Sequence, residues 1–345
     1  MNLVTGGGGF IGGHIVRLLL EEGARVRVLD LEPPLDLPAA VETVRGTVTD
    51  REVVDRVMAG VQRVFHVAGN PRLWDRDKRV FEEVHRRGTR TVLAAAAAAG
   101  VARIVHTSSA TVLLAVPPGV ATDVPAPPEA SHARLPGAYV RSKLAAEQEV
   151  REAVGRGVPV VTVRPTLPVG PGDRHRTPPT RMLVDFLAGR NPAFLESELN
   201  LIDVRDVARG HILAAERGTS GRAYLLGNQT FRLSELLALL ERLTGARMPD
   251  RRVPYALALA AAGVSELVAD FVSGRPPTAP LAGVRLAHRL RLHDPCAGAV
   301  ALGLPLTPIE TALSDAIAWL IAEGHVDAAW LPERGPAGAR RAERA

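Results

Sequence analysis

Short apolar segments and longer amphipathic segments alternate along the first half of the chain. The apolar segments have the length and the branched side chains of buried strands. They are the pair Leu3-Val4 and residues 25–29, 41–46, 61–69, 102–106 and 159–165. Helical spacing covers residues 12–20, 50–59, 75–99 and 137–154. Strands that alternate with helices form parallel βαβ units, so this pattern predicts an α/β fold with a Rossmann-like, doubly wound parallel sheet.

The alternation loosens beyond residue 166. Helical segments at 181–188, 204–217, 233–243, 254–272 and 308–322 accompany a single apolar strand at 223–226. We therefore expect a smaller, mostly helical substrate lobe over the carboxyl ends of the strands, where such folds bind ligands. The expected division is a dinucleotide-binding Rossmann domain at 1–166, to which about 200–226 returns, a substrate lobe at 167–330, and a disordered tail at 331–345. A Pro-rich loop spans residues 117–136.

Composition excludes several classes of function. The chain has 345 residues, of which 46% are apolar, so it can fill a substantial core. The lone cysteine, Cys296, allows no internal disulfide and fits a reducing compartment. Because the first predicted strand begins at residue 2, we expect no signal peptide and a cytoplasmic location. The net charge is +5, but no basic stripe interleaved with aromatic residues is present, so nucleic-acid binding is not expected.

The apolar helical segment at residues 253–272 has two interpretations. It contains only two charged residues, Glu266 and Asp270, and could lie against a membrane beside the entry of a lipid-like substrate. Its longest uninterrupted apolar run, residues 255–263, is far shorter than the roughly 20 residues of a membrane span. We favour a helix in the core of the small lobe, with no integral membrane segment.

A glycine-rich loop follows the first apolar segment. Gly6, Gly9 and Gly12 have the G-x-x-G-x-x-G spacing, close to the dinucleotide fingerprint. Glycine permits the tight turn and the close approach of a pyrophosphate, and the new helix offers free N–H groups to the phosphates. Asp30 ends the second strand, about 20 residues on, where an acid binds the adenosine ribose. These features predict a bound dinucleotide.

A tyrosine and a lysine four residues apart share one face of the helix at 137–154. A free phenol has a pKa near 10, and the ammonium of Lys143 together with a cationic nicotinamide would lower that value for Tyr139. Tyr139 could then exchange a proton with a substrate hydroxyl during hydride transfer. Ser109, at the end of the fifth strand, would hold the substrate oxygen. His106 and His175 lack metal-ligand spacing, so no metal site is expected.

These motifs resemble those of the extended short-chain dehydrogenases/reductases, often called NAD-dependent epimerase/dehydratases. The similarity covers about residues 2–325, and the nearest subgroup is the hopanoid-associated sugar epimerases and their dihydroflavonol-reductase-like relatives. Besides the glycine loop and the Tyr139/Lys143 pair, the similar stretches are His66-Val67-Ala68-Gly69, Thr107-Ser108-Ser109-Ala110-Thr111-Val112, residues 164–172 and residues 201–208. The subgroup is indicated by residues 71–77, 166–171 and 182–189.

The resemblance implies a role for each matching residue. Tyr139 is the implied acid/base, Lys143 binds the nicotinamide ribose and tunes Tyr139, and Ser109 orients the substrate oxygen. The implied cofactor contacts further include the diphosphate-binding amides of Phe10 and Ile11, the ribose-binding Asp30, and residues that line the cofactor or its carboxamide: Gly6, Gly9, Gly12, Val48, Ala68, Gly69, Pro165, Thr166 and Leu167. The substrate contacts expected are Arg72, Trp74, Thr111 and Leu167.

Three positions depart from the family pattern. Thr47 replaces a usual acid near adenine, so the Val48 backbone would make that contact instead. His85 stands where many members have an asparagine that orders the active-site end of a strand; we favour a helix-surface histidine over a substrate contact. Leu167 replaces the asparagine of nucleotide-sugar epimerases, and since leucine forms no side-chain hydrogen bond, this change favours a less polar substrate.

The reaction itself stays open between classes. Dehydration is disfavoured, because Ala110-Thr111 follows Ser109 where the dehydratases carry an Asp-Glu pair. The charge of Asp30 repels a 2′-phosphate and favours NAD over NADP. We therefore expect an NAD-dependent epimerase or dehydrogenase that acts on a secondary alcohol or ketone of a sugar or sugar-like small molecule, lipid-linked ones included. The alternatives are a dihydroflavonol-reductase-like NAD(P)H-dependent ketone reductase and a non-catalytic dinucleotide-binding regulator. The resemblance also implies a homodimer.

Overall fold

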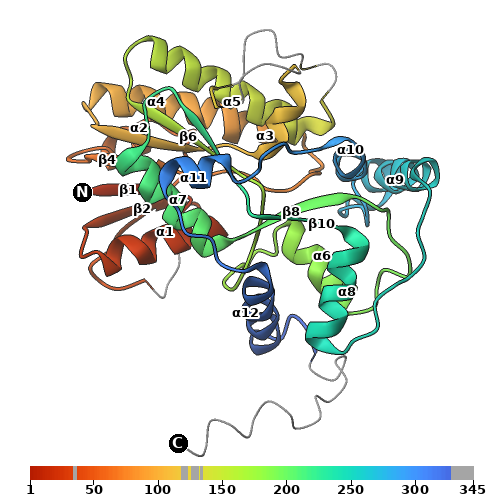
Figure 1. The fold of residues 1–345 in the computed structure, drawn as a ribbon. Helices are drawn as coiled ribbons and strands as arrows, with labels where there is room; N and C mark the ends of the chain where they lie inside the picture. Colours follow the sequence, from red (N-terminus) through yellow and green to blue (C-terminus); the bar gives the residue numbers. More distant parts are fainter. Residues whose placement is uncertain (34–36, 118–122, 126–131, 133–134, 328–345) are drawn as a thin grey trace, which may run out of the picture.

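Seven parallel strands form the central sheet of the computed structural model, which describes residues 1–33, 37–117, 123–125, 132 and 135–327 (Figure 1). The strand order is β3-β2-β1-β4-β5-β6-β9. The strands are β1 (Asn2–Thr5), β2 (Val26–Asp30), β3 (Glu42–Arg45), β4 (Arg63–His66), β5 (Arg103–Thr107), β6 (Val160–Pro165) and β9 (Ala223–Leu226). The order reverses between β1 and β4, which is the doubly wound topology predicted from the sequence.

Helices cover both faces of this sheet (Figure 1). On one face α1 (Phe10–Glu21) packs against α7 (Val204–Arg217). On the other face α2 (Arg51–Val57), α4 (Gly88–Ala98) and α5 (Gly137–Gly155) pack in sequence. Asp50 caps α2, since its Oδ1 accepts from the backbone N–H groups of Glu52 and Val53 in the first turn. Buried valines, leucines and isoleucines of the strands form the core between the layers.

The helix predicted at 75–99 is made of three pieces. It begins as α3 (Arg79–Phe81), widens into a π-helical segment η1 (Glu82–Arg87), and continues as α4. A π-helical turn inside an α-helix often occurs at a functional site. This one contains His85.

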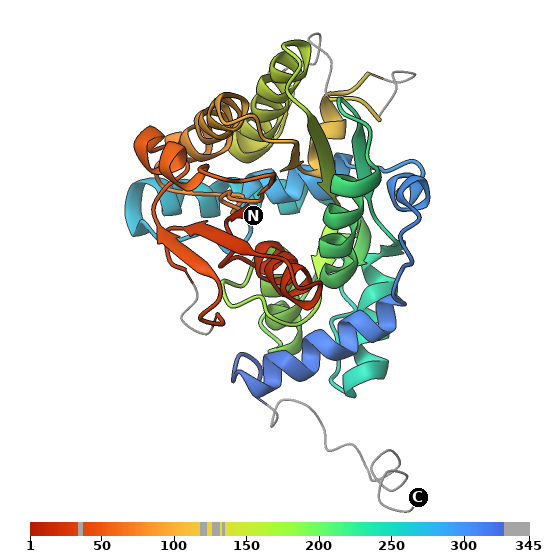
Figure 2. The ribbon, with the colours of Figure 1, turned by 90° about the vertical axis from the view of Figure 1, so that its left-hand side faces the viewer.

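A second sheet of three strands supports the smaller lobe. β7 (Leu167–Val169) pairs in parallel with β8 (Glu198–Asp203), and β8 pairs in antiparallel with β10 (Gln229–Arg232). The lobe, which includes α6 (Pro178–Leu187), α8 (Leu233–Thr244) and α12 (Ile309–Ala322), lies below the large sheet in Figures 1 and 2. The lobe is therefore less purely helical than the sequence suggests, because its strands are too short and too irregular in pattern to be recognised.

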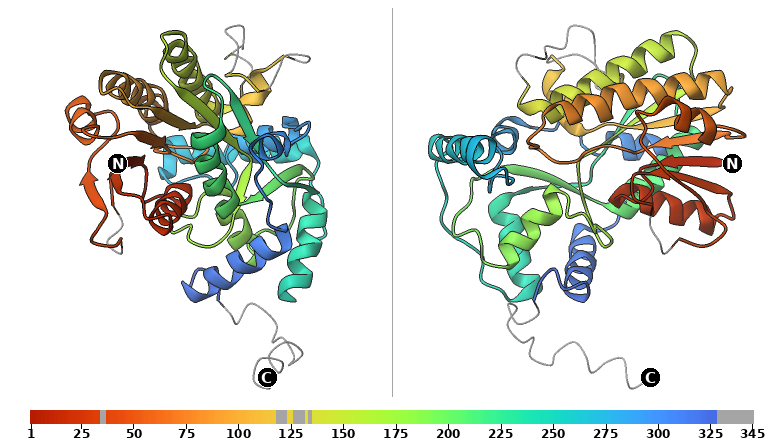
Figure 3. Two further views of the ribbon diagram at one scale, coloured as in Figure 1. Left: turned by 60° about the vertical axis from the view of Figure 1, so that its left-hand side comes forward. Right: turned by 180° about the vertical axis from the view of Figure 1, so that it is seen from behind.

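The helix predicted at 254–272 is present, but its predicted place in the core is wrong. The segment at Tyr255–Ser273, which comprises α9 (Tyr255–Val268) and a π-helical turn η4 (Ala269–Ser273), lies at the rim of the molecule in Figures 1 and 3. Only 11% of its most apolar 18-residue stretch is buried, so this helix does not belong to the core. By length and composition it is the one helix among the described residues that could cross a membrane. Its partner is α10 (Leu281–Arg289), and α11 (Ala297–Leu302) lies against β9.

Other predictions are only partly open to comparison with the structure. The strand at 223–226 and the helix at 204–217 have the predicted bounds. The tail at 331–345 and most of the Pro-rich loop at 117–136 lie outside the described residues. The dimer, the domain bounds and the cytoplasmic location stay predictions.

Candidate active site

The predicted site residues follow neighbouring strands at one edge of the large sheet. The glycine loop follows β1, Asp30 ends β2, Gly69 follows β4, and Ser109 follows β5. Parallel strands all end at the same edge, so the sheet order brings these segments side by side. The loop lies at the switch point between β1 and β4.

The glycine loop is packed too tightly for any side chain. Gly6 has a φ of 74°, and its N–H donates to Leu29 O at 2.8 Å. A Cβ added to Gly6 would lie 2.7 Å from the backbone N of Ala68, and one added to Gly12 would lie 2.0 Å from Gly6 O. Both contacts are with backbone that cannot move aside. The turn therefore requires glycine and keeps its backbone open to a ligand.

The amino end of α1 is free to receive an anion. Gly9 is the N-cap residue and provides no side-chain cap, and no acid lies in the first turn of α1. The first N–H groups of the helix and its positive dipole end therefore have no competing side-chain partner. A dinucleotide diphosphate fits this arrangement.

Asp30 is fixed beside the loop. Its Oδ2 accepts from Gly8 N at 2.8 Å and its Oδ1 from Glu32 N at 3.1 Å. Sequence reasoning missed Arg45, which lies opposite Asp30 in the β2–β3 register and donates from Nε to Leu31 O at 3.0 Å. The carboxylate thus carries a negative charge where the adenosine ribose is expected, and the nearby guanidinium is bonded to backbone.

Ser109, Tyr139 and Lys143 meet at the end of β5. The Tyr139 hydroxyl shares a hydrogen bond with Ser109, and Lys143 Nζ donates to Thr107 O at 3.0 Å. Lys143 Nζ would also lie 3.5 Å from a Cβ added to Gly69, so the ammonium lies next to one of the residues expected to line the cofactor. The three residues predicted as catalytic are therefore brought together.

Burial changes the acidity of this group. It lowers the pKa of Lys143 to about 8, with Glu147 acting in the opposite direction. Burial raises the pKa of Tyr139 above its ordinary value, and the hydrogen bond with Ser109 offsets part of that rise. This direction is opposite to the lowering expected from the sequence, because desolvation of the phenolate outweighs its neighbours when no dinucleotide charge is present. Tyr139 is thus a protonated acid in the free protein.

His85 is not a surface histidine, and this expectation from the sequence is wrong. The side chain is 2% exposed. Its Nε2 accepts from Asn70 N at 3.0 Å, and its Nδ1 lies 2.8 Å from Ser142 Oγ, which donates to Tyr139 O at 2.8 Å. Because Nε2 accepts, the proton is on Nδ1 and is donated to Ser142. Burial holds the pKa of His85 well below its usual value, in agreement with a neutral ring.

This chain of hydrogen bonds joins the segment after β4 to the first turn of the catalytic helix. The His85 ring also packs edge-on against the Tyr139 ring, with centroids 5.6 Å apart. The spacing of the sequence gives one indication that His85 is buried. It lies four residues after Phe81 and four before Thr89, on the same helix face, and all three side chains are buried. His85 makes both of these polar contacts from the π-helical turn η1.

Other buried histidines are structural. His66 Nδ1 bonds with Thr5 Oγ1 at 2.8 Å and its Nε2 with Thr89 Oγ1 at 3.0 Å. Burial lowers the pKa of His66 to about 3, so its ring is neutral and ties β4 to β1 and α4. No cluster of metal-ligating side chains occurs among the described residues.

The predicted substrate contacts are placed differently from one another. Thr111 Oγ1 donates to Ser109 Oγ at 3.0 Å, so it lies beside the three residues predicted as catalytic. Trp74 is buried and donates from Nε1 to Asp270 at 2.8 Å, whereas Arg72 is 70% exposed and pairs with Asp75 at 3.5 Å. Leu167 is half-buried in β7. Next to it, Thr166 has a buried Oγ1 with no hydrogen-bond partner in the described part of the chain, which leaves it available to a cofactor amide.

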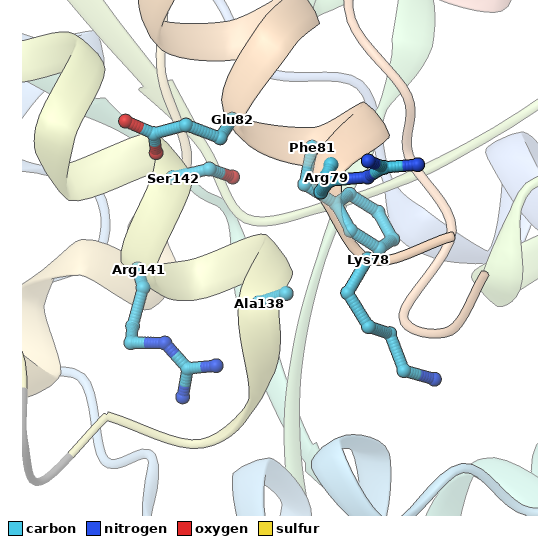
Figure 4. Close-up of a pocket in the computed structure, with 7 residues that line it drawn as sticks. All are labelled: Lys78, Arg79, Phe81, Glu82, Ala138, Arg141 and Ser142. Carbon is cyan, nitrogen blue, oxygen red and sulfur yellow. The ribbon is translucent and has the colours of Figure 1, made fainter. Parts of the chain in front are cut away.

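A shallow pocket of about 290 Å³ lies between α3 and α5 (Figure 4). Lys78, Arg79, Phe81 and Glu82 line it from one helix segment, and Ala138, Arg141 and Ser142 line it from α5. None of the three predicted catalytic side chains borders it. It is therefore not the predicted active site, although Ser142, which contacts His85, is part of its lining.

A fully buried ion pair beneath the site was missed by sequence reasoning. Glu147 lies one turn after Lys143 in α5, and its carboxylate contacts Arg164 of β6 through two bonds of 2.8 and 2.6 Å. Both side chains are 0% exposed. Arg164 also donates to Val124 O at 2.9 Å. The pair fixes the catalytic helix to the sheet.

Comparison with known proteins agrees with this geometry. The model of the NAD dependent epimerase/dehydratase family matches residues 2–227. A Synechocystis protein named "Putative dihydroflavonol 4-reductase" is 38% identical over 333 residues, 94% of this chain and 95% of the relative. Sterol demethylase protein B of Methylococcus capsulatus is 32% identical over 332 residues, 94% and 99% of the two chains.

Two further similarities extend the comparison. A Stigmatella aurantiaca 4-hydroxy-2-methyl-3-oxo-4-farnesyl-3,4-dihydroquinoline-1-oxide ketoreductase is 32% identical over 303 residues, 84% of this chain and 88% of the relative. The crystal structure of gox2253 superposes with a TM-score of 0.79 at 33% identity, covering 94% of this chain and 99% of that one. The predicted fold and the resemblance to extended short-chain dehydrogenases/reductases are confirmed.

Proposed function

Because this chain belongs to the NAD-dependent epimerase/dehydratase family, we propose that it interconverts a secondary alcohol and a ketone on an apolar small molecule, with NAD as the hydride carrier. The enzyme class is that of the extended short-chain dehydrogenases/reductases. The observation that carries the proposal is the meeting of Ser109, Tyr139 and Lys143 beside an open glycine loop.

The cofactor would be held by the edge of the large sheet. The loop at 6–12 and the amino end of α1 would bind the diphosphate, Asp30 the adenosine ribose, and Val48 the adenine. Lys143 would bind the nicotinamide ribose, with Gly69 and the segment at 165–167 along the ring. When bound there, the nicotinamide accepts a hydride from the substrate carbon or returns it. The Asp30 charge supports NAD rather than NADP.

The protein side chains would handle the proton. Ser109 Oγ accepts from Thr111 Oγ1 at 3.0 Å and from Thr111 N at 3.3 Å, so its own proton is left for the substrate oxygen or the phenol. Tyr139 would give its proton to a ketone oxygen during reduction, or take one during oxidation. The Lys143 ammonium stabilises the phenolate that forms in the first case.

An apolar substrate is supported by two observations. Leu167 stands where nucleotide-sugar epimerases hold asparagine, and it offers no hydrogen bond to a sugar. One relative is named as a sterol demethylase protein and another as a ketoreductase of a farnesyl-substituted dihydroquinoline oxide. A sterol and a farnesyl group both consist largely of hydrocarbon. A regulator without catalytic activity would have no use for the intact phenol, ammonium and hydroxyl.

The test is NAD reduction by the purified enzyme, measured at the NADH absorbance band with sterol-like and isoprenoid secondary alcohols and, separately, with nucleotide sugars. We expect turnover with the apolar alcohols. Tyr139→Phe should lower kcat about 100-fold or more, because proton transfer is lost, and leave NADH affinity within about twofold. Tyr224→Phe is the matched control, since the Tyr224 hydroxyl contacts Thr219 N at 3.0 Å in the turn that precedes β9.

Unchanged turnover in Tyr139→Phe would refute the assigned acid/base. Epimerisation of a sugar is the competing reaction of this family. Mass spectrometry that finds NAD retained through purification, together with no net NADH production from any alcohol, would favour it over the proposed oxidoreduction.

A further inference from the structure

The outer face of the helix at Tyr255–Ser273 is apolar along its whole length. Every exposed position from 256 to 272 carries an apolar side chain. We call this set the apolar stripe: Ala256, Leu257, Ala260, Ala261, Val264, Leu267, Val268, Phe271 and Val272. Phe271 and Val272 are 82% and 80% exposed. A surface helix normally turns its polar face outward, so this helix has the reverse arrangement.

The polar side chains of this helix face the protein. Asp270 accepts from Trp74 Nε1 at 2.8 Å and from Lys78 Nζ at 3.1 Å. Glu266 accepts from Leu281 N at 2.9 Å, and Tyr255 stacks on His288 of α10 with centroids 3.8 Å apart. The helix, which lies at the rim of the molecule (Figures 1 and 3), is thus docked through its polar side, and its apolar side is exposed.

Arginines stand at both ends of the stripe. Arg251 and Arg252 precede the helix and are exposed, and Arg275 follows it and is exposed. Arg76 lies next to that second end, since its guanidinium would be 3.2 Å from a Cβ added to Gly274. Asp250 and the Glu196 partner of Arg252 are the acids nearby at the first end. The first end therefore carries two arginines and two acids and the second carries Arg76 and Arg275, on either side of an apolar face about 25 Å long at 1.5 Å per residue.

We propose that the apolar stripe binds, parallel to the surface, to a lipid bilayer that contains anionic headgroups. The stripe would enter the boundary of the acyl chains while the flanking arginines meet the headgroups. A second copy of the chain fits less well, because the stripe has no hydrogen-bonding side chain and protein interfaces carry about one hydrogen bond per 100–200 Å². Crossing the bilayer would place Glu266, Asp270 and their partners in hydrocarbon, at high cost.

Docking in this way would bring the substrate side of the enzyme to the membrane. Asp270 joins the helix to Trp74 and Lys78, which belong to the segment between β4 and the His85 helix. An apolar substrate could then pass from the bilayer to the site without crossing water. This use of the stripe rests on the proposed function, whereas the binding to lipid does not.

The experiment is co-sedimentation of the full-length protein with vesicles, without substrate. One set contains phosphatidylcholine mixed with phosphatidylglycerol, and the other contains phosphatidylcholine alone. We expect binding mainly to the anionic set, weakened by salt and released by high salt. The double change Phe271→Glu with Val272→Glu should reduce the bound fraction about tenfold or more, because charge enters the apolar boundary.

Val300→Glu is the matched control, since Val300 is 77% exposed on α11 and lies outside the stripe. It should bind vesicles as the wild type does, and both variants should keep the wild-type unfolding temperature. Arg251→Gln with Arg275→Gln should remove the preference for anionic vesicles. The proposal is wrong if the wild type binds neither vesicle set or if the stripe variant binds normally.

Two other outcomes would also overturn it. If alkaline carbonate fails to release the protein from vesicles, the helix spans the bilayer. If sedimentation velocity without vesicles shows that the stripe variant loses an oligomer that Val300→Glu retains, a second copy covers the stripe. Because none of these measurements uses turnover, a failure here is separate from a failure of the proposed reaction.

Discussion

His85 shows how a single side chain can position the predicted acid/base Tyr139 through contacts other than with its reactive hydroxyl. It connects Asn70, beside the expected cofactor strip, to Ser142 and through it to the Tyr139 carbonyl. The network needs one acceptor and one donor about an imidazole's width apart, and a neutral ring supplies both. The residue is therefore a positioning residue, and its effect should reach turnover through Tyr139.

Replacement of His85 should separate positioning from binding. We expect His85→Leu to lower kcat about tenfold, because the change leaves Asn70 N–H without its acceptor, removes the donor to Ser142 Oγ and loosens Tyr139. His85→Asn should recover part of that loss, since an amide can both accept and donate. Steady-state kinetics and NADH titration of each variant are the measurements.

His175→Leu is the control, because His175 is exposed in the loop after β7. It should leave kcat and NADH affinity unchanged. Equal kcat in His85→Leu and the wild type would show that the network is not needed for catalysis. A loss of kcat in His85→Leu that His85→Asn does not relieve at all would point to shape rather than hydrogen bonding.

At the scale of the element, the turn from β1 into α1 determines where a diphosphate can lie. Gly12 is in the first turn of α1 and packs onto Gly6 O, whereas the adjacent Gly13 would place a Cβ 3.7 Å from its nearest neighbour, an ordinary contact. Two consecutive glycines in one helix thus have opposite requirements. One allows helix and loop to touch, and the other is only a weak helix former.

Gly12→Ala and Gly13→Ala should therefore change the free energy of unfolding differently. We expect Gly12→Ala to lower the free energy of unfolding by about 2 kcal/mol or more and to weaken NADH binding, since a 2.0 Å contact with backbone must be relieved. Gly13→Ala should be neutral or raise stability by about 0.5 kcal/mol. Urea unfolding and NADH fluorescence titration measure both, and equal effects would contradict the packing argument.

At the scale of the whole molecule, the buried pair of Glu147 and Arg164 joins the catalytic helix, the large sheet and the segment at 123–125. Such a pair adds little net stability compared with apolar packing, but an isolated partner is a buried charge. Glu147 follows Lys143 by one helical turn. The same pair therefore also helps to hold the Lys143 ammonium in place relative to the large sheet.

Glu147→Gln should destabilise the protein by about 3 kcal/mol or more, because the buried guanidinium of Arg164 would lose the negative charge of this carboxylate. Urea unfolding is the measurement. Glu152→Gln, an exposed position further along α5, should change the free energy of unfolding by less than about 0.5 kcal/mol. A Glu147→Gln variant as stable as Glu152→Gln would show that water reaches Arg164.

The sequence by itself determined the parts of this protein that depend on local order. Glycine spacing, a cap acid at Asp50, and apolar runs separated by helical stretches each depend on neighbours in the chain. They predicted the parallel sheet, its ligand-binding edge and the residue types of the catalytic trio. The three short strands of the second sheet were not predictable in this way, since β7 has three residues and pairs with a strand about 30 residues later.

Only the tertiary structure decided which face of each helix is covered. Helical spacing places His85 on one face of its helix but does not say what packs against that face. In the fold, the His85 side chain contacts Asn70 and Ser142. The same spacing gives the segment at 255–273 an apolar side, yet Asp270 and Glu266 bind inward and leave that side outward. Burial is a property of what packs against a residue, and these partners come from distant segments of the chain.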